Sequence, residues 1–261
     1  MSPELELFLI PGLPLLACLL FSALALKPGR ERSAPAWLII ALAGSLLLSV
    51  KALAEVADGH SLHASVPWLH VGPIRLQMGA HVDGLAAVML IVVSSVSLLV
   101  QIYSTGYMRG EIGYGRYFAY MSLFSGSMLG LVIADNIVQM YIFWELVGIC
   151  SYLLIGFWYR RPSAAAAAKK AFVVTRFGDL GFFAAVLVIS LSGGAVFGFE
   201  DLARSLGIPN VHVLDPVKVR TEFERLLAEA LASRSLTLLI VRRPCLLAAK
   251  RNADQTRTSQ G

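Results

Sequence analysis

The chain has 261 residues, of which 57% are hydrophobic and 15% carry a charge. Soluble domains are about 25% charged, and the mean hydropathy of +0.69 lies far on the apolar side, so the composition favours a membrane protein over a soluble enzyme. The net charge of +5 is expected in loops that face the cytoplasm. No basic patch is interleaved with aromatic residues, so we expect no nucleic-acid partner.

Six apolar segments follow one another within residues 1–200, and each is predicted to be a transmembrane helix. A span needs about 20 apolar residues. The sixth segment is the weakest candidate because it contains four charged residues, which are costly in lipid. We therefore predict an all-α membrane domain whose helices cover residues 7–26, 36–57, 84–105, 117–134, 137–159 and 167–192.

The connection between the second and third helices is long enough to hold structure of its own. It alternates apolar and polar residues around a Gly-Pro turn at residues 72–73, which predicts a small hairpin outside the membrane. Four of the five histidines lie in this region: His60, His63, His70 and His81. We interpret them as interfacial residues. A metal site is the alternative, although no cysteine or compact carboxylate cluster accompanies them.

The loop charges predict how the chain crosses the membrane. The first, third and fifth loops are basic, whereas the second and fourth are not. By the positive-inside rule, the odd loops face the cytoplasm and the N-terminus lies outside. We expect a multi-pass protein of the inner (plasma) membrane.

Glu145 is the only charge in the fifth segment, about eight residues from its start. A charge at mid-span costs roughly 2.5–3.5 kcal/mol on insertion scales, and intramembrane carboxylates usually face a bundle interior or water. Burial and a nearby cation act in opposite directions on the proton affinity of a carboxylate. Glu145 is therefore a candidate proton carrier. The alternative is a structural carboxylate that is hydrogen-bonded to a neighbouring helix.

The sixth segment carries a second group of charges. Arg176 and Asp179 are three residues apart, so they lie on one helix face and can pair, as can Lys51 and Glu55 in the second segment. From the spacing alone, a functional role for the Arg176 pair and a self-neutralised pair that lets the helix insert are equally open. Asp83 and Asp135 stand at helix boundaries, where caps or interfacial residues are expected.

Residues 201–261 are predicted to form an atypical basic tail, with ten Lys or Arg against six Asp or Glu. Residues 217–232 are typical of an amphipathic helix. The apolar run 236–241 is too short to span a membrane before Arg242, Arg243 and Pro244. The polar end, residues 250–261, is expected to be disordered.

Three ordered stretches carry a family resemblance: YMRGEIGYGRYFAY at 107–120, ADNIVQMYIFWELVGICSYLLIGF at 134–157 and KAFVVTRFGDLG at 170–181. Together they resemble the antiporter-like membrane subunit called chain 5, or subunit L, of NADH-quinone oxidoreductase (respiratory complex I). The resemblance covers roughly residues 5–200. The related Mrp-type sodium/proton antiporter subunit shares parts of it.

The resemblance implies the N-terminal part of an antiporter-like helical bundle that moves protons, driven by redox chemistry elsewhere in the complex. Glu145 matches the glutamate of a proton half-channel and Asp179 an aspartate of the sixth helix, while Arg176 and Lys170 belong to the same motif. NAD, FMN, iron–sulfur clusters and quinone would belong to partner subunits, so this chain would carry no cofactor and no redox chemistry. Its implied partners are the other membrane subunits, the lipid bilayer and protons.

The sequence also departs from the family pattern. The family subunit is much longer, and its seventh helix carries a lysine, in a Gly-Lys-Ser-Ala-type motif, that partners the glutamate. That motif does not occur here. Residues 236–241 resemble the start of this helix and then turn polar. We therefore expect a truncated or frameshifted chain in which Glu145 lacks its partner. The alternatives are an Mrp-type antiporter subunit and a fragment that does not transport.

Overall fold

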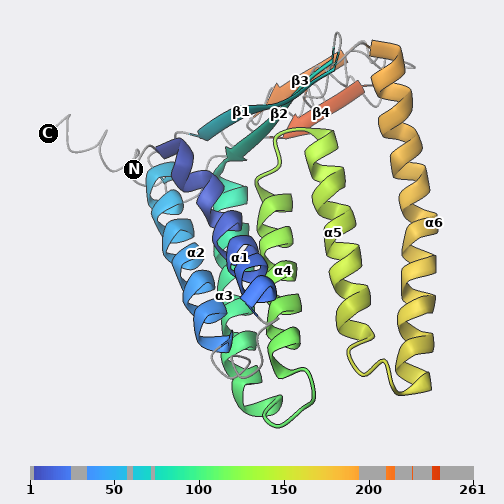
Figure 1. The fold of residues 1–261 in the computed structure, drawn as a ribbon. Coiled ribbons are helices and arrows are strands. Elements are labelled where there is room, and N and C mark those ends of the chain that lie inside the picture. The colour runs from blue at the N-terminus through green and yellow to red at the C-terminus, as the bar shows by residue number, and fades with distance from the viewer. Residues whose placement is uncertain are drawn as a thin grey trace, which may run out of the picture.

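The computed structural model describes residues 3–24, 34–57, 61–71, 74–193, 210–214, 225 and 237–241. Six helices lie side by side in this part of the chain, with a β-hairpin at one end of them (Figure 1). The predicted all-α membrane bundle is confirmed. The helices are α1 (Pro3–Leu24), α2 (Ala34–Val56), α3 (Gly84–Tyr107), α4 (Tyr114–Val132), α5 (Ile137–Ile155) and α6 (Pro162–Gly193). The hairpin consists of β1 (Leu62–Val71) and β2 (Ile74–Val82).

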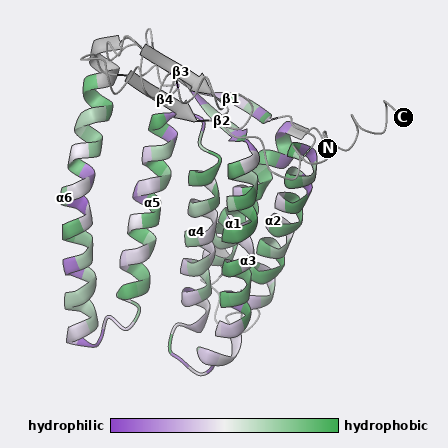
Figure 2. Ribbon diagram, turned by 180° about the vertical axis from the view of Figure 1, so that it is seen from behind, coloured by the Kyte–Doolittle hydropathy of each residue, from purple (hydrophilic) through white to green (hydrophobic). Residues whose placement is uncertain are grey.

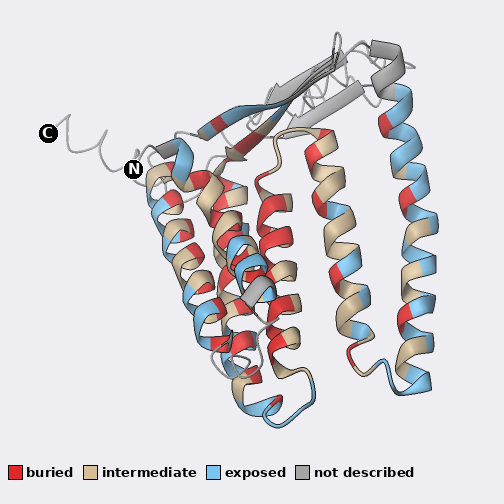
Figure 3. Ribbon diagram, viewed as in Figure 1, coloured by how far each residue is buried: buried red, intermediate tan, exposed pale blue. Residues whose placement is uncertain are grey.

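Five of the described helices are long and apolar enough to cross a membrane: α1, α2, α3, α5 and α6. Figure 2 shows long hydrophobic stretches on α1, α2 and α3. The helix α4 is less apolar because it is rich in Ser, Gly and Tyr. It packs against α1, α3 and α5, and buried residues recur along it (Figure 3). A helix enclosed by other helices needs no lipid-facing apolar surface, so α4 can be polar and still belong to the bundle.

Two glycines allow the neighbours of α4 to approach closely. A Cβ at Gly126 would lie 2.7 Å from Leu15 Cγ of α1. A Cβ at Gly130 would overlap the ring of Phe143 on α5. The Gly-x-x-x-Gly spacing therefore serves two interfaces, as expected for small residues in a membrane bundle.

The helix ends differ from the predicted ones by a few residues. The helix α5 ends at Ile155, and Gly156 is its C-cap, so the predicted extension to 159 is wrong. The helix α6 begins at Pro162, before the predicted start at 167. Proline is favoured in the first turn of a helix, and the alanines that follow it are the best helix formers.

The predicted hairpin is present, with β1 and β2 antiparallel and His63 opposite His81. The start of α5 anchors it to the bundle. The Gln139 side chain accepts a hydrogen bond from Gly79 N at 2.9 Å and donates one to Gly79 O at 2.7 Å. The His81 N–H donates to Ile133 O at 3.0 Å. The side of the membrane on which the hairpin lies stays a prediction.

Two expectations about boundary charges are confirmed, and for Asp135 the structure excludes the cap and leaves the interfacial alternative. Lys51 pairs with Glu55 at 3.7 Å and also with Glu6 of α1. Asp83 caps α3, because its Oδ1 accepts from Ala86 N at 2.8 Å. Asp135 does not cap α5. Its neighbour Asn136 does, and Asp135 lies 3.1 Å from His63 Nε2 instead. In the described part of the chain, no three His, Cys, Asp or Glu side chains gather in a way that could hold a metal ion, and His60 lies outside that part.

Residues in the basic tail form two short strands, β3 (Asn210–Leu214) and β4 (Thr237–Val241), which pair in parallel. The expectation that residues 236–241 begin a helix is therefore wrong. Thr237, Ile240 and Val241 of β4 are β-branched, and β-branched side chains are favoured in strands. The helix predicted over 217–232 lies outside the described residues apart from residue 225, and residues 250–261 lie wholly outside them.

Candidate functional site

Two helices that pack against each other, α5 and α6, each carry a charge near their middle. Glu145 lies within α5 and Arg176 within α6. The Arg176 guanidinium pairs with the Glu145 carboxylate, and its Nη2 donates to the Glu145 backbone carbonyl at 3.2 Å. The arginine therefore contacts both the side chain and the main chain of the glutamate. This places Glu145 in an ion pair that joins the two helices.

Asp179 completes the cluster from α6, one turn after Arg176. Its Oδ2 lies 3.5 Å from Arg176 Nη1, so the pair predicted from the spacing is confirmed. Its Oδ1 accepts a hydrogen bond from Trp144 Nε1 at 2.8 Å. Asp179 is buried, and these two contacts supply the partners that a buried carboxylate requires.

The charges in this cluster do not balance. Glu145 and Asp179 share a single guanidinium, that of Arg176, among the described residues. The Phe172 ring, 4.9 Å from the guanidinium carbon, adds a cation–π contact without a charge. The ionised cluster therefore carries one excess negative charge at mid-span, where such a charge is costly. Binding one proton to either carboxylate would remove it.

Gly148 gives the arginine the space to reach the glutamate. A Cβ at this position would lie 2.5 Å from Arg176 Nη2, which is closer than carbon and nitrogen can approach without a shift. Gly148 lies three residues after Glu145, so the two face the same side of α5. A side chain at position 148 would therefore force the Arg176 guanidinium to shift from its place beside Glu145.

A cavity of about 320 Å³ adjoins the cluster. Its charged walls are Glu145, Arg176 and Asp179, and its other walls are aromatic or aliphatic: Tyr141, Phe172, Val173, Phe177 and Leu180. A water molecule occupies about 30 Å³ in the liquid, so several fit. Two carboxylates and a cation beside such a space can accept, hold and release a proton.

Three of the four predicted site residues meet in this cluster: Glu145, Arg176 and Asp179. The fourth, Lys170, is exposed on α6 six residues before Arg176 and forms no ion pair in the described part of the chain. Arg176 gives Glu145 a cationic partner on the neighbouring helix, which is a different group from the lysine that the family resemblance implies.

Sequence reasoning missed the contact of Trp144 with Asp179. An indole N–H in an apolar helix needs an acceptor, which was the available signal for Trp144. Gly148 is expected from the sequence as a site where helices approach closely, and the structure shows that the group that approaches it is the Arg176 guanidinium.

Comparisons with known proteins show which protein families the sequence of this chain matches. Residues 68–118 match the family described as NADH-Ubiquinone oxidoreductase (complex I), chain 5 N-terminus. Residues 134–231, which include the cluster, match the family described as NADH:quinone oxidoreductase/Mrp antiporter, TM.

Curated relatives agree with these matches. NAD(P)H-quinone oxidoreductase chain 5 of a Synechocystis species is 48% identical over 171 residues, which are 65% of this chain and 25% of the relative. The chloroplastic subunit 5 of Chlorokybus atmophyticus is 42% identical over 205 residues, which are 76% of this chain and 31% of the relative. The chain thus spans about a quarter to a third of the length of these relatives.

Solved structures show the same fold. A chain of the archaeal membrane-bound sulfane sulfur reductase superposes with a TM-score of 0.65 at 19% identity, covering 77% of this chain and 40% of that one. A chain of the Mrp complex from a Dietzia species superposes with a TM-score of 0.57 at 26% identity, covering 76% and 20%. The chain belongs to the family of antiporter-like membrane subunits that includes chain 5 of the NAD(P)H-quinone oxidoreductases and is related to the Mrp antiporters.

Proposed function

We propose that this chain forms part of a proton-translocating membrane subunit of an NADH-quinone oxidoreductase. The observation that carries the proposal is the pair of carboxylates, Glu145 and Asp179, that share Arg176 at mid-span beside a cavity. Redox chemistry belongs to partner subunits, which hold NAD, FMN, iron–sulfur clusters and quinone. This chain contributes the route for protons.

The geometry suggests how the cluster passes a proton. Arg176 contacts both carboxylates, so a small movement of its guanidinium toward one leaves the other less compensated. The less compensated carboxylate then becomes the better proton acceptor, because a nearby cation favours the ionised form. Trp144 holds Asp179 in place through its N–H. Alternation of Arg176 between Glu145 and Asp179 would move the proton affinity from one side chain to the other.

Lys170 extends this route along α6 toward the Pro162 end. It lies six residues before Arg176, a displacement of about 9 Å along the helix axis at a rise of 1.5 Å per residue. That end of α6 follows the basic loop of Arg160 and Arg161, which we place in the cytoplasm by the positive-inside rule. Lys170 would then relay protons between the cytoplasmic surface and the cluster.

The test is proton transport by the assembled complex in inverted membrane vesicles. Proton uptake is followed with a pH-sensitive dye and divided by the rate of quinone reduction. Because a positioned proton-transfer group contributes about a hundredfold or more, Glu145→Gln is expected to abolish most of the coupled uptake. Asp179→Asn is expected to reduce it. Glu4→Gln, which removes an exposed carboxylate at the start of α1, is the matched control. If Glu145→Gln took up as many protons per quinone reduced as the wild type, the proposal would be refuted.

A sodium/proton antiporter of the Mrp type is the second candidate. It is favoured by the match of residues 134–231 to a family shared with Mrp antiporters and by the superposition on the Mrp complex. Replacing sodium with choline in the same vesicles separates the two functions. Proton movement that requires sodium and does not depend on electron transfer would establish the antiporter.

A further inference from the structure

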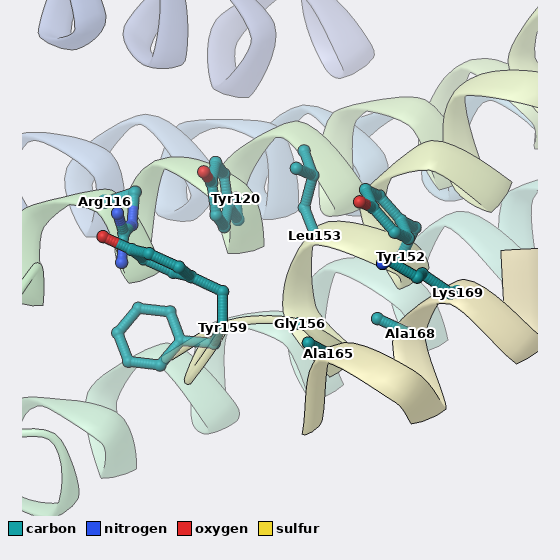
Figure 4. Close-up of a pocket in the computed structure, with 10 residues that line it drawn as sticks. Arg116, Tyr120, Tyr152, Leu153, Gly156, Tyr159, Ala165, Ala168 and Lys169 are labelled. Atoms are coloured by element: carbon teal, nitrogen blue, oxygen red, sulfur yellow. The ribbon is translucent and has the colours of Figure 1, made fainter. Parts of the chain in front are cut away.

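A second cavity, of about 290 Å³, lies where α4 begins, α5 ends and α6 begins. Two cations line it, Arg116 of α4 and Lys169 of α6, together with three tyrosines. Figure 4 shows Arg116 and Lys169 on opposite sides of the cavity, with the Tyr159 hydroxyl beside the Arg116 guanidinium. The remaining walls are small or apolar: Leu153, Gly156, Phe157, Ala165 and Ala168.

The positive charge of this cavity is uncompensated. No carboxylate lines it, and neither Arg116 nor Lys169 forms an ion pair within the described ranges. Arg116 Nε is buried without a hydrogen-bond partner. Buried donors are normally satisfied, so this guanidinium keeps a donor that a ligand oxygen could accept from.

The guanidinium of Arg116 is fixed before any ligand arrives. Its central carbon lies 5.4 Å from the centroid of the Phe157 ring and 5.2 Å from that of Tyr159. Stacking between two aromatic rings limits the side-chain entropy that binding would cost. Its planar fork of donors matches the geometry of a phosphate group.

The local potential favours an anion. Together Arg116 and Arg160 lower the pKa of the Tyr159 hydroxyl, because adjacent guanidinium groups stabilise its phenolate. Tyr120 and Tyr152 add two hydroxyl groups to the lining. A hydroxyl donates readily to an anionic oxygen, so the cavity offers charged and neutral donors together.

The position of the cavity in the bilayer identifies the source of the anion. The apolar span of α5 ends at Ile155 and that of α6 starts at Pro162, so the cavity lies at the level of the lipid headgroups. Tyrosine is enriched at this level of a membrane, and Lys and Arg are enriched in the loops on its cytoplasmic side. A phosphate bound here would stand beside acyl chains that lie along the exposed apolar residues of the helices, such as Val173.

We propose that this cavity binds the phosphate of an anionic phospholipid, with Arg116 and Lys169 as its two cationic contacts. The absence of any carboxylate from the lining selects a headgroup of net negative charge over a zwitterionic one, whose ammonium would meet only cations. The site joins α4, α5 and α6 at the end of the bundle opposite the hairpin (Figure 1). It is separate from the Glu145 cluster and goes beyond the proposed proton route.

The experiment is native mass spectrometry of the purified full chain in detergent, with added phosphatidylglycerol, phosphatidylcholine or inorganic phosphate. The wild type is expected to retain phosphatidylglycerol about tenfold better than phosphatidylcholine, and Lys169→Gln and Arg116→Gln to lose most of that preference. The matched control is Arg109→Gln, which removes an exposed arginine outside the cavity. Lys169 is exposed, so its variant tests the site without a risk to folding.

Each outcome decides the proposal. Loss of phosphatidylglycerol in Lys169→Gln with retention in Arg109→Gln supports it. If the wild type and both cavity variants retain phosphatidylglycerol equally, the cavity is not the binding site and the proposal is overturned. Binding of inorganic phosphate that Lys169→Gln abolishes, without any preference among lipids, would assign the cavity to a soluble anion and overturn the lipid as its source.

Discussion

Gly148 controls how closely Arg176 can approach Glu145. In Gly148→Ala the new Cβ would lie 2.5 Å from Arg176 Nη2, so the guanidinium must move away from α5. Its contact with Asp179, on its own helix, can persist. We expect coupled proton uptake to fall about tenfold while the complex still assembles. Weakening the pair of Arg176 and Glu145 changes how the guanidinium compensates the charges of both carboxylates.

The matched control for this variant is Gly178→Ala on α6, where a Cβ meets nothing within 4 Å. It makes the same chemical change two residues from Arg176 and should preserve coupling. Equal uptake in Gly148→Ala and Gly178→Ala would show that the distance between Arg176 and Glu145 does not matter for transport.

Tyr159 reports the positive potential at the basic end of the bundle. Its pKa is lowered chiefly by Arg116 and also by Arg160, so Arg116→Gln should raise that pKa toward the ordinary value. A folded-state pKa below the unfolded one stabilises the fold at alkaline pH, and that contribution is lost as the pH falls through the folded-state pKa. Spectroscopic titration of tyrosinate, assigned with Tyr159→Phe, measures the shift.

Arg161 provides the comparison for the tyrosine titration. Its guanidinium lies over Trp158, 5.3 Å from the ring centroid, and it does not contribute to the shift at Tyr159. Arg161→Gln should therefore leave the Tyr159 pKa unchanged. A shift of equal size in both arginine variants would mean that net charge, rather than the contact with Arg116, sets the Tyr159 pKa.

Helices could be predicted where an apolar run is too long to form a strand. The start of α3 could also be predicted, because Asp83 is a typical cap. The boundaries of α5 and α6 could not, since hydropathy marks neither the C-cap at Gly156 nor the proline that begins α6.

Contacts within one helix could be predicted from spacing, and contacts between helices could not. The pairs Arg176–Asp179 and Lys51–Glu55 follow from separations of three and four residues. In each case a further partner comes from another helix, Glu145 for Arg176 and Glu6 for Lys51. Those partners depend on how the helices pack against one another, and the periodicity of a single helix carries no information about that packing.

A buried side chain at the start of α5 contributes to the attachment of the hairpin to the bundle. Gln139 makes two hydrogen bonds to the backbone of Gly79 in β2. In Gln139→Leu both backbone groups lose their partner, at about 1–3 kcal/mol for each buried group left unsatisfied. We expect faster hydrogen exchange at residues 77–81 and a lower unfolding temperature.

Gln77→Leu makes the same substitution on an exposed side chain of the same hairpin. Its backbone carbonyl still accepts from Asn136 Nδ2, so exchange should stay at the wild-type rate. Identical exchange in the two leucine variants would show that other contacts, such as the bridge between Ala80 and Ala134, hold the hairpin.

The two ends of the whole bundle differ in charge. The N-terminus of α1 and the hairpin lie at one end (Figure 1). At the other end, the connection between α3 and α4 brings Arg109 and the one between α5 and α6 brings Arg160 and Arg161. Basic connections remain in the cytoplasm because the K/R bias of short loops sets orientation. The hairpin and the N-terminus should then both lie outside.

This orientation can be tested with single cysteines in a chain whose native cysteines are replaced by alanine. Ser65→Cys places a thiol on an exposed position of β1, and Arg109→Cys places one in the connection between α3 and α4. A membrane-impermeant maleimide added to right-side-out vesicles should label position 65 at once and position 109 only after permeabilisation. The reverse order would put the hairpin in the cytoplasm. It would then also reverse the direction of the proposed proton route through Lys170.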